Sequence, residues 1–336
     1  IDKGEFFVVF GPSGSGKTVL LRLLSGIMLL DDGKIEMGSE VINELQPEER
    51  DISMAFQNFA LYPHMKAYDN IASPLRANKN RIPDDEIDLK VREVASLLKI
   101  EHVLNQFPKE LSNGQKQRTS LARSLISKPS VVLLDDPLRN VDAKIRFEMR
   151  LELPKVLKEF NTTVVYVTQD FREAMALGDR IAVLYERKCN DIDSPKKIYQ
   201  NPSSLTTAKL FGDPTINNFD ANIKKQNEFV VINVNGEQFK LKRKTNIQDG
   251  DCIVGIRPED IILSNEPSEN SIEVEFRTKT PLNLRIVFLV RLKNGLELLC
   301  STTEEESQLI DENKKMYISF LEEKSHFFDL ETKRNL

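Results

Sequence analysis

The chain lacks the surplus of basic residues that a nucleic-acid-binding protein needs. Its formal net charge is −5 over 336 residues, whereas neutralising phosphates requires a basic face. We therefore expect no nucleic acid as a partner. The length allows two domains with a core each, and the balance of apolar and charged residues is typical of a globular protein.

Cysteine is scarce as well. Cys189, Cys252 and Cys300 lie far apart in the sequence and show neither metal-ligand spacing nor a paired framework. We interpret them as free thiols in a reducing cytoplasm.

Long apolar runs are missing too, since none reaches the roughly 18 to 20 residues of a membrane-spanning helix. The nearest run, residues 19–30, is shorter and contains Arg22 and Gly26. Work at a membrane therefore requires partner proteins. The chain begins at Ile1, almost on an apolar strand, and we expect a further N-terminal segment before it.

The first part of the chain has solid apolar runs separated by helical patterns. Runs that are apolar on both faces predict buried parallel strands covered by helices. The runs are FFVVF (6–10), VVLL (131–134), TVVYV (163–167) and IAVL (181–184). The apolar spacing predicts a helix over 145–160 and a helical insertion over about 74–128. Together these patterns predict an α/β nucleotide-binding core.

After about Gly212 the apolar period changes to two. Asn235-Gly236 and Asn294-Gly295 each separate alternating segments, and Asn-Gly accepts the positive φ angles of a two-residue type I′ turn. Both therefore predict β-hairpins. We expect one domain over residues 1–212 and a small antiparallel, barrel-like all-β domain over 213–336.

The segment GPSGSGKT fits the phosphate-loop pattern, with an apolar strand before it and an apolar helix after it. Its glycines let backbone N–H groups close around phosphates, Lys17 reaches the β and γ oxygens, and Thr18 supplies a Mg²⁺ ligand. A glycine-rich turn without a ligand is the alternative that this setting disfavours. We expect ATP and Mg²⁺ to bind here. The residues expected to hold the nucleotide are Gly11, Pro12, Ser13, Gly14, Ser15, Gly16, Lys17 and Thr18.

The strand VVLLDD ends with Asp135, where it can hold Mg²⁺ through water. Taken alone, an acidic turn residue after a strand is the more ordinary interpretation. The phosphate loop favours the metal role.

A third segment, LSNGQKQRTSLARSL at 111–125, resembles the signature sequence of ABC-type ATPases. It precedes VVLLDDP, as in that family, and Gln57 in AFQNFALYPHM matches the family's glutamine loop. By itself the segment would simply predict a helix capped by Ser112. Four markers in the family's order favour the resemblance, which implies Gln57 as a Mg²⁺ ligand and catalytic group.

The resemblance extends over essentially the whole chain, to the ATP-binding subunits of sugar and glycerol-phosphate importers. The segments that carry it are 60–76, 193–202, 255–261 and 327–336. In that family the C-terminal domain is a small OB-like barrel that regulates or strengthens a dimer. A sensor and a plain dimerisation module both stay open here.

The resemblance implies a head-to-tail pair with a second ATP-binding subunit, as a homodimer or a heterodimer. Each ATP would contact the phosphate loop of one chain and Ser112, Gly114 and Gln115 of the other. The pair would drive two transmembrane permease subunits, served by a solute-binding protein, at the cytoplasmic face of the cell membrane. Coupling is then a population shift caused by a ligand that binds the closed state better.

Two positions depart from the family where water attacks the phosphate. The family's general base is a glutamate after Asp135, but here Asp136 is one methylene shorter, and a misplacement of about 1 Å can cost on the order of a hundredfold in rate. The family's histidine after the next strand is Gln169, which carries no charge. Smaller departures are Asn113, at the first signature glycine, and Arg139, where a small Ser is usual.

The groups that bind nucleotide are retained, while the two that govern water attack are altered together. The leading hypothesis is an importer subunit, for a carbohydrate or glycerol-phosphate-like solute, whose own catalytic site is weakened or silent within a heterodimer. One alternative is a fully active homodimeric ATPase in which Asp136 and Gln169 suffice. The other is a non-hydrolysing ABC protein that uses ATP only to gate an interaction.

Overall fold

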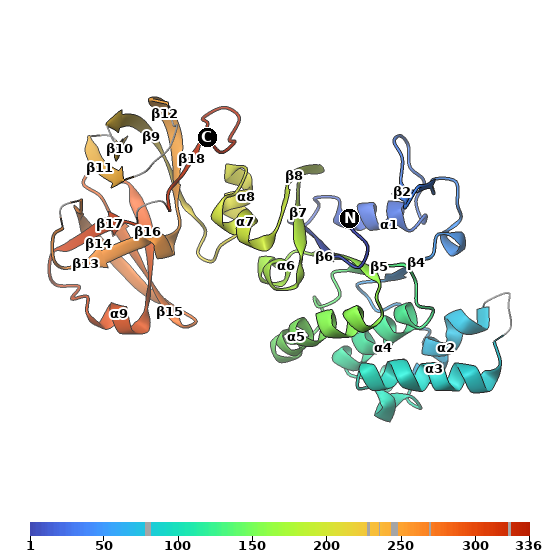
Figure 1. Ribbon diagram of the computed structural model, residues 1–336. Helices are drawn as coiled ribbons and strands as arrows, with labels where there is room; N and C mark the ends of the chain where they lie inside the picture. Colours follow the sequence, from blue (N-terminus) through green and yellow to red (C-terminus); the bar gives the residue numbers. More distant parts are fainter. Residues whose placement is uncertain (78–81, 227–228, 235, 243–247, 269, 322–323) are drawn as a thin grey trace. The chain divides into compact units, whose positions relative to one another are not determined.

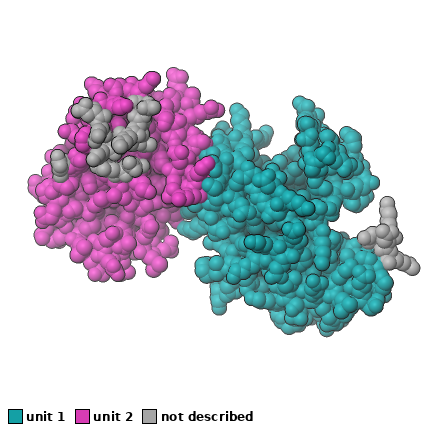
Figure 2. Space-filling view, in the orientation of Figure 1, with its two compact units in different colours: residues 1–195 teal, residues 196–336 magenta. Residues whose placement is uncertain are grey.

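The chain folds into two compact units, Ile1–Pro195 and Lys196–Leu336, each with its own sheets and core (Figures 1 and 2). The computed structural model describes residues 1–77, 82–226, 229–234, 236–242, 248–268, 270–321 and 324–336.

The first unit is built on a six-stranded sheet in the order β4-β5-β6-β1-β7-β8. The strands are β1 (Phe6–Phe10), β4 (Ile52–Ala55), β5 (Val131–Asp135), β6 (Thr163–Thr168), β7 (Arg180–Tyr185) and β8 (Lys188–Asp193). All neighbours pair in parallel except β7 and β8. The four apolar runs thus form strands, as predicted, and the α/β core is confirmed.

The register of this sheet brings three strand ends together. Phe10 at the end of β1 pairs with Thr168 at the end of β6, and Asp135 at the end of β5 pairs with Val167. Because the strands are parallel, the segments that follow them leave the same edge of the sheet. The predicted phosphate loop, the acidic residues Asp135 and Asp136, and Gln169 therefore all lie at one edge of the sheet.

Helices cover this sheet, and three of them lie in or next to residues 74–128, where a helical insertion is expected. Leu21 of α1 packs into the sheet core with Val9, Leu133 and Val165. The helices are α1 (Lys17–Leu24), α2 (Ala67–Ala77), α3 (Asp84–Leu97), α4 (Asn113–Leu125), α5 (Ala143–Glu159) and α6 (Phe171–Leu177). α2, α3 and α4 pack on one another as a helical layer, and α5 confirms the helix predicted over 145–160 (Figure 1).

Short elements complete the first unit. They are the two-stranded hairpin β2 (Glu36–Met37) and β3 (Glu40–Val41) and the single turns η1 (Pro47–Glu49), η2 (Glu101–Val103) and η3 (Pro108–Glu110). Over the residues that the structure describes in both units, no helix is long and apolar enough to cross a membrane.

The second unit is an antiparallel all-β assembly of two five-stranded sheets, consistent with the expected OB-like domain. The first sheet contains β11 (Glu237–Lys242), β10 (Phe229–Val234), β9 (Asn217–Gln226), β12 (Gly250–Ile256) and β18 (His326–Phe328). The second contains β13 (Ile261–Ser264), β17 (Met316–Phe320), β14 (Ile272–Leu282), β15 (Arg285–Arg291) and β16 (Glu297–Thr303). Alternating apolar residues from both sheets share one core, in which the rings of Phe239 and Phe320 lie 4.4 Å apart.

Short helices accompany these sheets: α7 (Pro195–Gln200), α8 (Leu205–Leu210), η4 (Pro258–Asp260) and α9 (Glu304–Gln308). The buried side chain of Arg257, just before η4, donates to the backbone oxygens of Tyr199 and Phe211. Its guanidinium also lies over the Tyr199 ring, 3.6 Å from the centroid. These contacts fasten the ends of α7 and α8 to the strands of this unit.

Both predicted hairpins form, but one turn differs from the expectation. β10 pairs with β11 from Val234 and Glu237 outward, while Asn235 itself lies outside the described residues. Between β15 and β16, both residues of the pair Asn294-Gly295 are described and only Gly295 has a positive φ, 88°. The two-residue type I′ turn predicted there is therefore wrong.

The connection between β15 and β16 instead runs over 292–296. Gly295 N donates to Leu292 O at 2.9 Å, and Leu292 N donates to Leu296 O at 2.8 Å. This is a turn followed by a left-handed glycine, which forms a bulge. Asn294 contributes through its side chain, which accepts from Leu296 N at 3.0 Å.

Candidate nucleotide-binding site

The phosphate loop, residues 11–18, connects the end of β1 to the start of α1. A Cβ atom on Gly11 would lie 2.1 Å from the backbone oxygen of Leu184 in β7, so only glycine fits there. Gly16 caps α1 in a left-handed conformation with φ 101°. The loop is therefore pinned against the sheet at one end and turns sharply into the helix at the other.

Lys17 is the buried cation of this loop, with 5% of its surface exposed. Its Nζ donates to Gly11 O at 2.8 Å, to Pro12 O at 2.7 Å and to Ser15 Oγ at 3.3 Å. Burial lowers the pKa of Lys17, and the nearby carboxylates of Asp136 and Asp135 oppose that shift. An ammonium held by neutral oxygens at a helix N-terminus is well placed to bind a phosphate.

Thr18 and Asp135 are brought together across the sheet edge. Thr18 Oγ1 donates to Asp135 Oδ1 at 3.1 Å. Burial raises the pKa of Asp135, so its ionised form gains from a nearby cation. A hydroxyl and a carboxylate oxygen are ligands that Mg²⁺ prefers, and Mg²⁺ is commonly held by one or two carboxylates together with substrate phosphates. The residues present thus fit the expected metal.

Gln57 lies in the segment after β4, and its backbone oxygen accepts from Asn140 Nδ2 at 3.1 Å. This contact joins the glutamine segment to the turn that follows β5. A role of the Gln57 side chain toward Mg²⁺ stays a prediction. Within the described ranges there is no group of three or more His, Cys, Asp or Glu side chains that could hold a metal by itself.

Asp136 lies beside a hollow of about 350 Å³, here called the Asp136 hollow. It is lined by Asp136, Arg139, Arg146, Gln169, Asp170, Phe171, Arg172 and Glu173. Asp136 is 7% exposed, has φ 45°, and its N–H donates to Val167 O at 2.9 Å. Burial, and then the charge of Glu173, raise the pKa of Asp136 to about 6, while Arg139 opposes the shift. Gln169 lines the same hollow, so the structure brings the two altered positions together.

The sequence analysis missed Glu173, a buried carboxylate behind this hollow. It accepts from Tyr166 Oη at 2.9 Å and from Thr168 Oγ1 at 2.8 Å, and Arg150 lies 3.8 Å away. Burial raises the pKa of Glu173. The sequence does contain a signal for it. Tyr166 and Thr168 lie two apart in β6, so their hydroxyl groups share a face, and an acidic residue follows in the first turn of α6.

Ser112, Gly114 and Gln115 form the start of α4. Ser112 Oγ accepts from Gln115 N at 3.3 Å, and Gln115 Oε1 accepts from Ser112 N at 2.8 Å, which is a capping box. These hydrogen bonds are local. Within the described residues of a single chain, they do not join the signature segment to the phosphate loop, so its expected contact with a partner's nucleotide stays a prediction.

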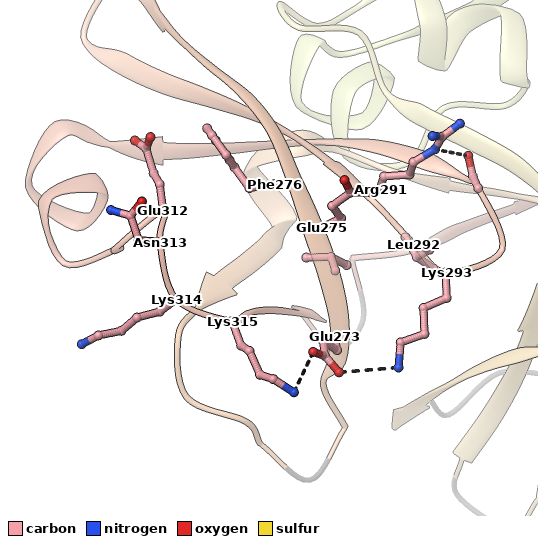
Figure 3. A pocket seen from close by; sticks show the side chains of 12 residues that line it. Glu273, Glu275, Phe276, Arg291, Leu292, Lys293, Glu312, Asn313, Lys314 and Lys315 are labelled. Carbon is pink, nitrogen blue, oxygen red and sulfur yellow. Dashed lines mark hydrogen bonds and ion pairs between the residues drawn. The ribbon is translucent and has the colours of Figure 1, made fainter.

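The second unit contains a larger hollow, of about 680 Å³, bordered by β14 and by the turns before β16 and β17 (Figure 3). Its charged side chains largely compensate one another, because Glu273 lies 3.0 Å from Lys315 and 3.5 Å from Lys293. No phosphate loop or helix N-terminus opens into it among the residues that line it. The size of a hollow therefore does not locate the nucleotide site in this chain.

One family model and several known proteins are similar in sequence to this chain. The family model described as ABC transporter matches residues 1–139. The chain is 37% identical to the trehalose/maltose import ATP-binding protein MalK of Thermococcus litoralis, over 99% of this chain and 92% of that protein. It is 41% identical to the sn-glycerol-3-phosphate import ATP-binding protein UgpC of Psychromonas ingrahamii, over 82% of this chain and 72% of that protein. It is 36% identical to the xylose/arabinose import ATP-binding protein XacK of Haloferax volcanii, over 99% of this chain and 87% of that protein.

A solved structure is similar as well. It is the dimeric structure of a post-hydrolysis state of the ATP-binding cassette MJ0796 bound to ADP and Pi, with a TM-score of 0.53 and 30% sequence identity. The similarity covers 58% of this chain and 87% of that one.

Proposed function

The chain belongs to the ABC transporter family of import ATP-binding proteins, and from this membership we propose that it couples ATP binding and hydrolysis to solute import. The solute class is a carbohydrate or a glycerol-phosphate-like compound, in line with the names of its relatives. Residues 1–212 act as the ATP-binding domain and 213–336 as a regulatory or dimerisation domain.

One observation supports the proposal most strongly. The buried Lys17 ammonium is held by backbone oxygens of the phosphate loop, next to the hydrogen bond between Thr18 and Asp135. The residues of the loop, Gly11, Pro12, Ser13, Gly14, Ser15, Gly16, Lys17 and Thr18, bind the phosphates of ATP. Lys17 exchanges its backbone acceptors for β and γ oxygens, which are stronger, charged acceptors. Thr18, Asp135 and Gln57 would hold Mg²⁺, which would neutralise negative charge on the phosphates.

The partners follow from the importer role. A second ATP-binding subunit faces this chain, so that Ser112, Gly114 and Gln115 complete the nucleotide site of the other subunit. Two permease subunits, with a solute-binding protein outside, place the assembly at the cytoplasmic face of the membrane. The solved cassette that resembles this chain is a dimer, which supports the pairing.

The chain's own site turns over slowly. Asp136, as the general base, is one methylene short of a glutamate. Its pKa of about 6 leaves the carboxylate mostly ionised, and so able to accept a proton, near neutral pH. Gln169 donates a hydrogen bond without a positive charge. A heterodimer whose other subunit carries an intact site would compensate for both.

The test is the Mg-ATP hydrolysis rate of the purified full chain beside two variants, Lys17→Ala and the double variant Asp136→Glu with Gln169→His. We expect wild type to bind ATP, Lys17→Ala to bind none, and the double variant to hydrolyse faster by up to about a hundredfold. Wild type turning over as fast as the double variant would instead establish an active homodimeric motor.

A separate outcome concerns the transporter itself. Copurification of this chain with two permease subunits from its own membranes is expected. If neither wild type nor the double variant hydrolyses ATP and no permease copurifies, the chain is an ATP-gated binding protein, and the importer proposal fails.

A further inference from the structure

Arg139 is held next to Asp136 by the turn that follows β5. Its N–H donates to Asp136 O at 3.2 Å, which folds the chain back within three residues. Its Nη1 lies 3.8 Å from Asp136 Oδ2, and half of the side chain is exposed to the Asp136 hollow and solvent. The ion pair is therefore long, and its cation is accessible.

A short path of contacts joins the same guanidinium to the phosphate loop, because Asp136 follows Asp135, whose Oδ1 accepts from Thr18 Oγ1 at 3.1 Å. Lys17 directly precedes Thr18, and Arg139 is paired with the residue that follows Asp135. Two cations from different segments therefore accompany this contact. Their mutual repulsion is relieved when an anion with several negative oxygens lies between them.

The other arginines that line this hollow are engaged differently. Arg146 donates to the backbone oxygens of Leu138, at 3.2 Å, and Val141, at 3.1 Å, so it holds the turn in place. Arg172 lies over the ring of its neighbour Phe171, with 5.6 Å between Cζ and the centroid. Arg139 is the arginine of this hollow whose side chain is paired with the candidate general base.

We propose that Arg139 binds the terminal phosphate of ATP held by its own chain, leaving Asp136 when the nucleotide enters. The proposal rests on the proposed function, because it requires ATP in the phosphate loop. A phosphate offers the guanidinium two parallel, charge-assisted hydrogen bonds, which outcompete a single contact at 3.8 Å. Arg139 thereby supplies the positive charge that Gln169 lacks and leaves the Asp136 carboxylate available to water.

The inference predicts that Arg139 discriminates ATP from ADP. We would measure the affinities of the full chain, with Mg²⁺, for ADP and for the non-hydrolysable analogue adenylyl imidodiphosphate. Arg139→Ser should weaken binding of the analogue by roughly tenfold to a hundredfold, the range for a charged hydrogen bond, and leave ADP affinity unchanged. Arg139→Lys should recover part of the loss.

Arg172→Ser is the matched control, because it removes the same charge from the same hollow. It should leave the ratio of the two affinities as in wild type. The Arg139→Ser effect should also be independent of protein concentration, since the contact lies within one chain. An effect seen only at concentrations where the chain dimerises would overturn the proposal and place Arg139 at the partner's nucleotide.

A kinetic cycle gives a second readout. Arg139→Ser should raise KM for ATP by about the factor by which it weakens binding of the analogue, and it should lower kcat as well. The effect on kcat should shrink in a Gln169→His background, where a second cation is available. If Arg139→Ser raises kcat with an unchanged affinity ratio, Arg139 is an inhibitory latch on Asp136 and the proposal is wrong. Equal losses for ADP and analogue would make its role structural, which also overturns it.

Failure of the proposed function is distinguishable from failure of this inference. If wild type and Lys17→Ala bind both nucleotides equally, the phosphate loop is not a nucleotide site and the proposed function fails. If Lys17→Ala abolishes binding while Arg139→Ser leaves the affinity ratio untouched, the function stands and only the role of Arg139 is wrong.

Discussion

The phosphate loop and the Asp136 hollow begin at neighbouring strand ends but are held in different ways. The loop is fixed by backbone geometry: Gly11 abuts the Leu184 carbonyl, and Lys17 is bound by oxygens of the loop itself. The hollow is defined by side chains from several segments, among them a long ion pair between Asp136 and Arg139. In the loop, Gly11 leaves no room even for a Cβ atom, whereas the hollow depends on the side chains that line it.

This difference explains how binding and hydrolysis can be separated in one chain. A backbone cradle depends on glycines and on one lysine, so its loss removes binding altogether. A hydrolytic centre depends on the reach and charge of individual side chains, so it can be weakened in steps. The proposed weakening at Asp136 and Gln169 would be two such steps, and the proposed role of Arg139 would be a step in the opposite direction.

The largest effect is expected from Gly11→Ala. The added methyl group would lie 2.1 Å from Leu184 O, so either the loop or β7 has to move. We expect ATP affinity to fall on the order of a hundredfold, the upper range for overpacking. Gly38→Ala is the control, because a Cβ there meets no atom within 4 Å and the strain from its φ of 64° arises between β2 and β3. It should leave the affinity unchanged. Titration with a fluorescent ATP analogue measures both, and unchanged affinity in Gly11→Ala would contradict the rigid cradle.

A smaller effect is expected at the junction of the two regions, from Thr18→Val. The change keeps the branched shape but removes the hydroxyl that donates to Asp135 at 3.1 Å. The factor by which Mg²⁺ raises ATP affinity should then be on the order of tenfold smaller than in wild type. The affinity measured without Mg²⁺ should be nearly unchanged. Thr18→Ser retains the hydroxyl and should behave as wild type. A loss that is the same with and without Mg²⁺ would argue against a metal ligand.

The same division decides how much the sequence predicts. The four apolar runs, α5 and the phosphate loop follow from local patterns, because burial on both faces and a fixed glycine spacing leave few alternatives. The turn at Asn294-Gly295 was mistaken because Asn-Gly is also compatible with a bulged turn of one left-handed residue.

The composition of the Asp136 hollow is not readable from local patterns. Asp136 follows β5 and Glu173 lies in α6, which follows β6. Their electrostatic interaction depends on the packing of β5 beside β6. Arg139 is recognisable in the sequence as an unusual residue, but its contact with Asp136 depends on the turn between them. Long-range side-chain placement is what the sequence alone leaves undetermined here.

The smallest effect concerns the stability of the fold and follows from the buried charge of Asp136. Its pKa in the folded protein, about 6, lies above its usual 3.8, so the folded state holds the proton more tightly than the unfolded state. Ionisation of Asp136 therefore lowers the free energy of unfolding. This loss grows as pH rises from about 4 to about 6 and stays constant above that range. Asp136→Asn removes this cost but keeps a buried polar group.

We compare the free energy of unfolding of Asp136→Asn with that of wild type. We expect this difference to rise by about 1 to 2 kcal/mol between pH 4.5 and pH 7.5, which is less than the full shift of the Asp136 pKa implies. Urea denaturation at the two pH values measures it. Asp85→Asn, at an exposed position of α3, is the control. A pH-independent difference for Asp136→Asn would mean that Arg139 and Lys17 already neutralise this carboxylate in the absence of nucleotide. The Asp136 hollow would then be as tightly fixed as the phosphate loop.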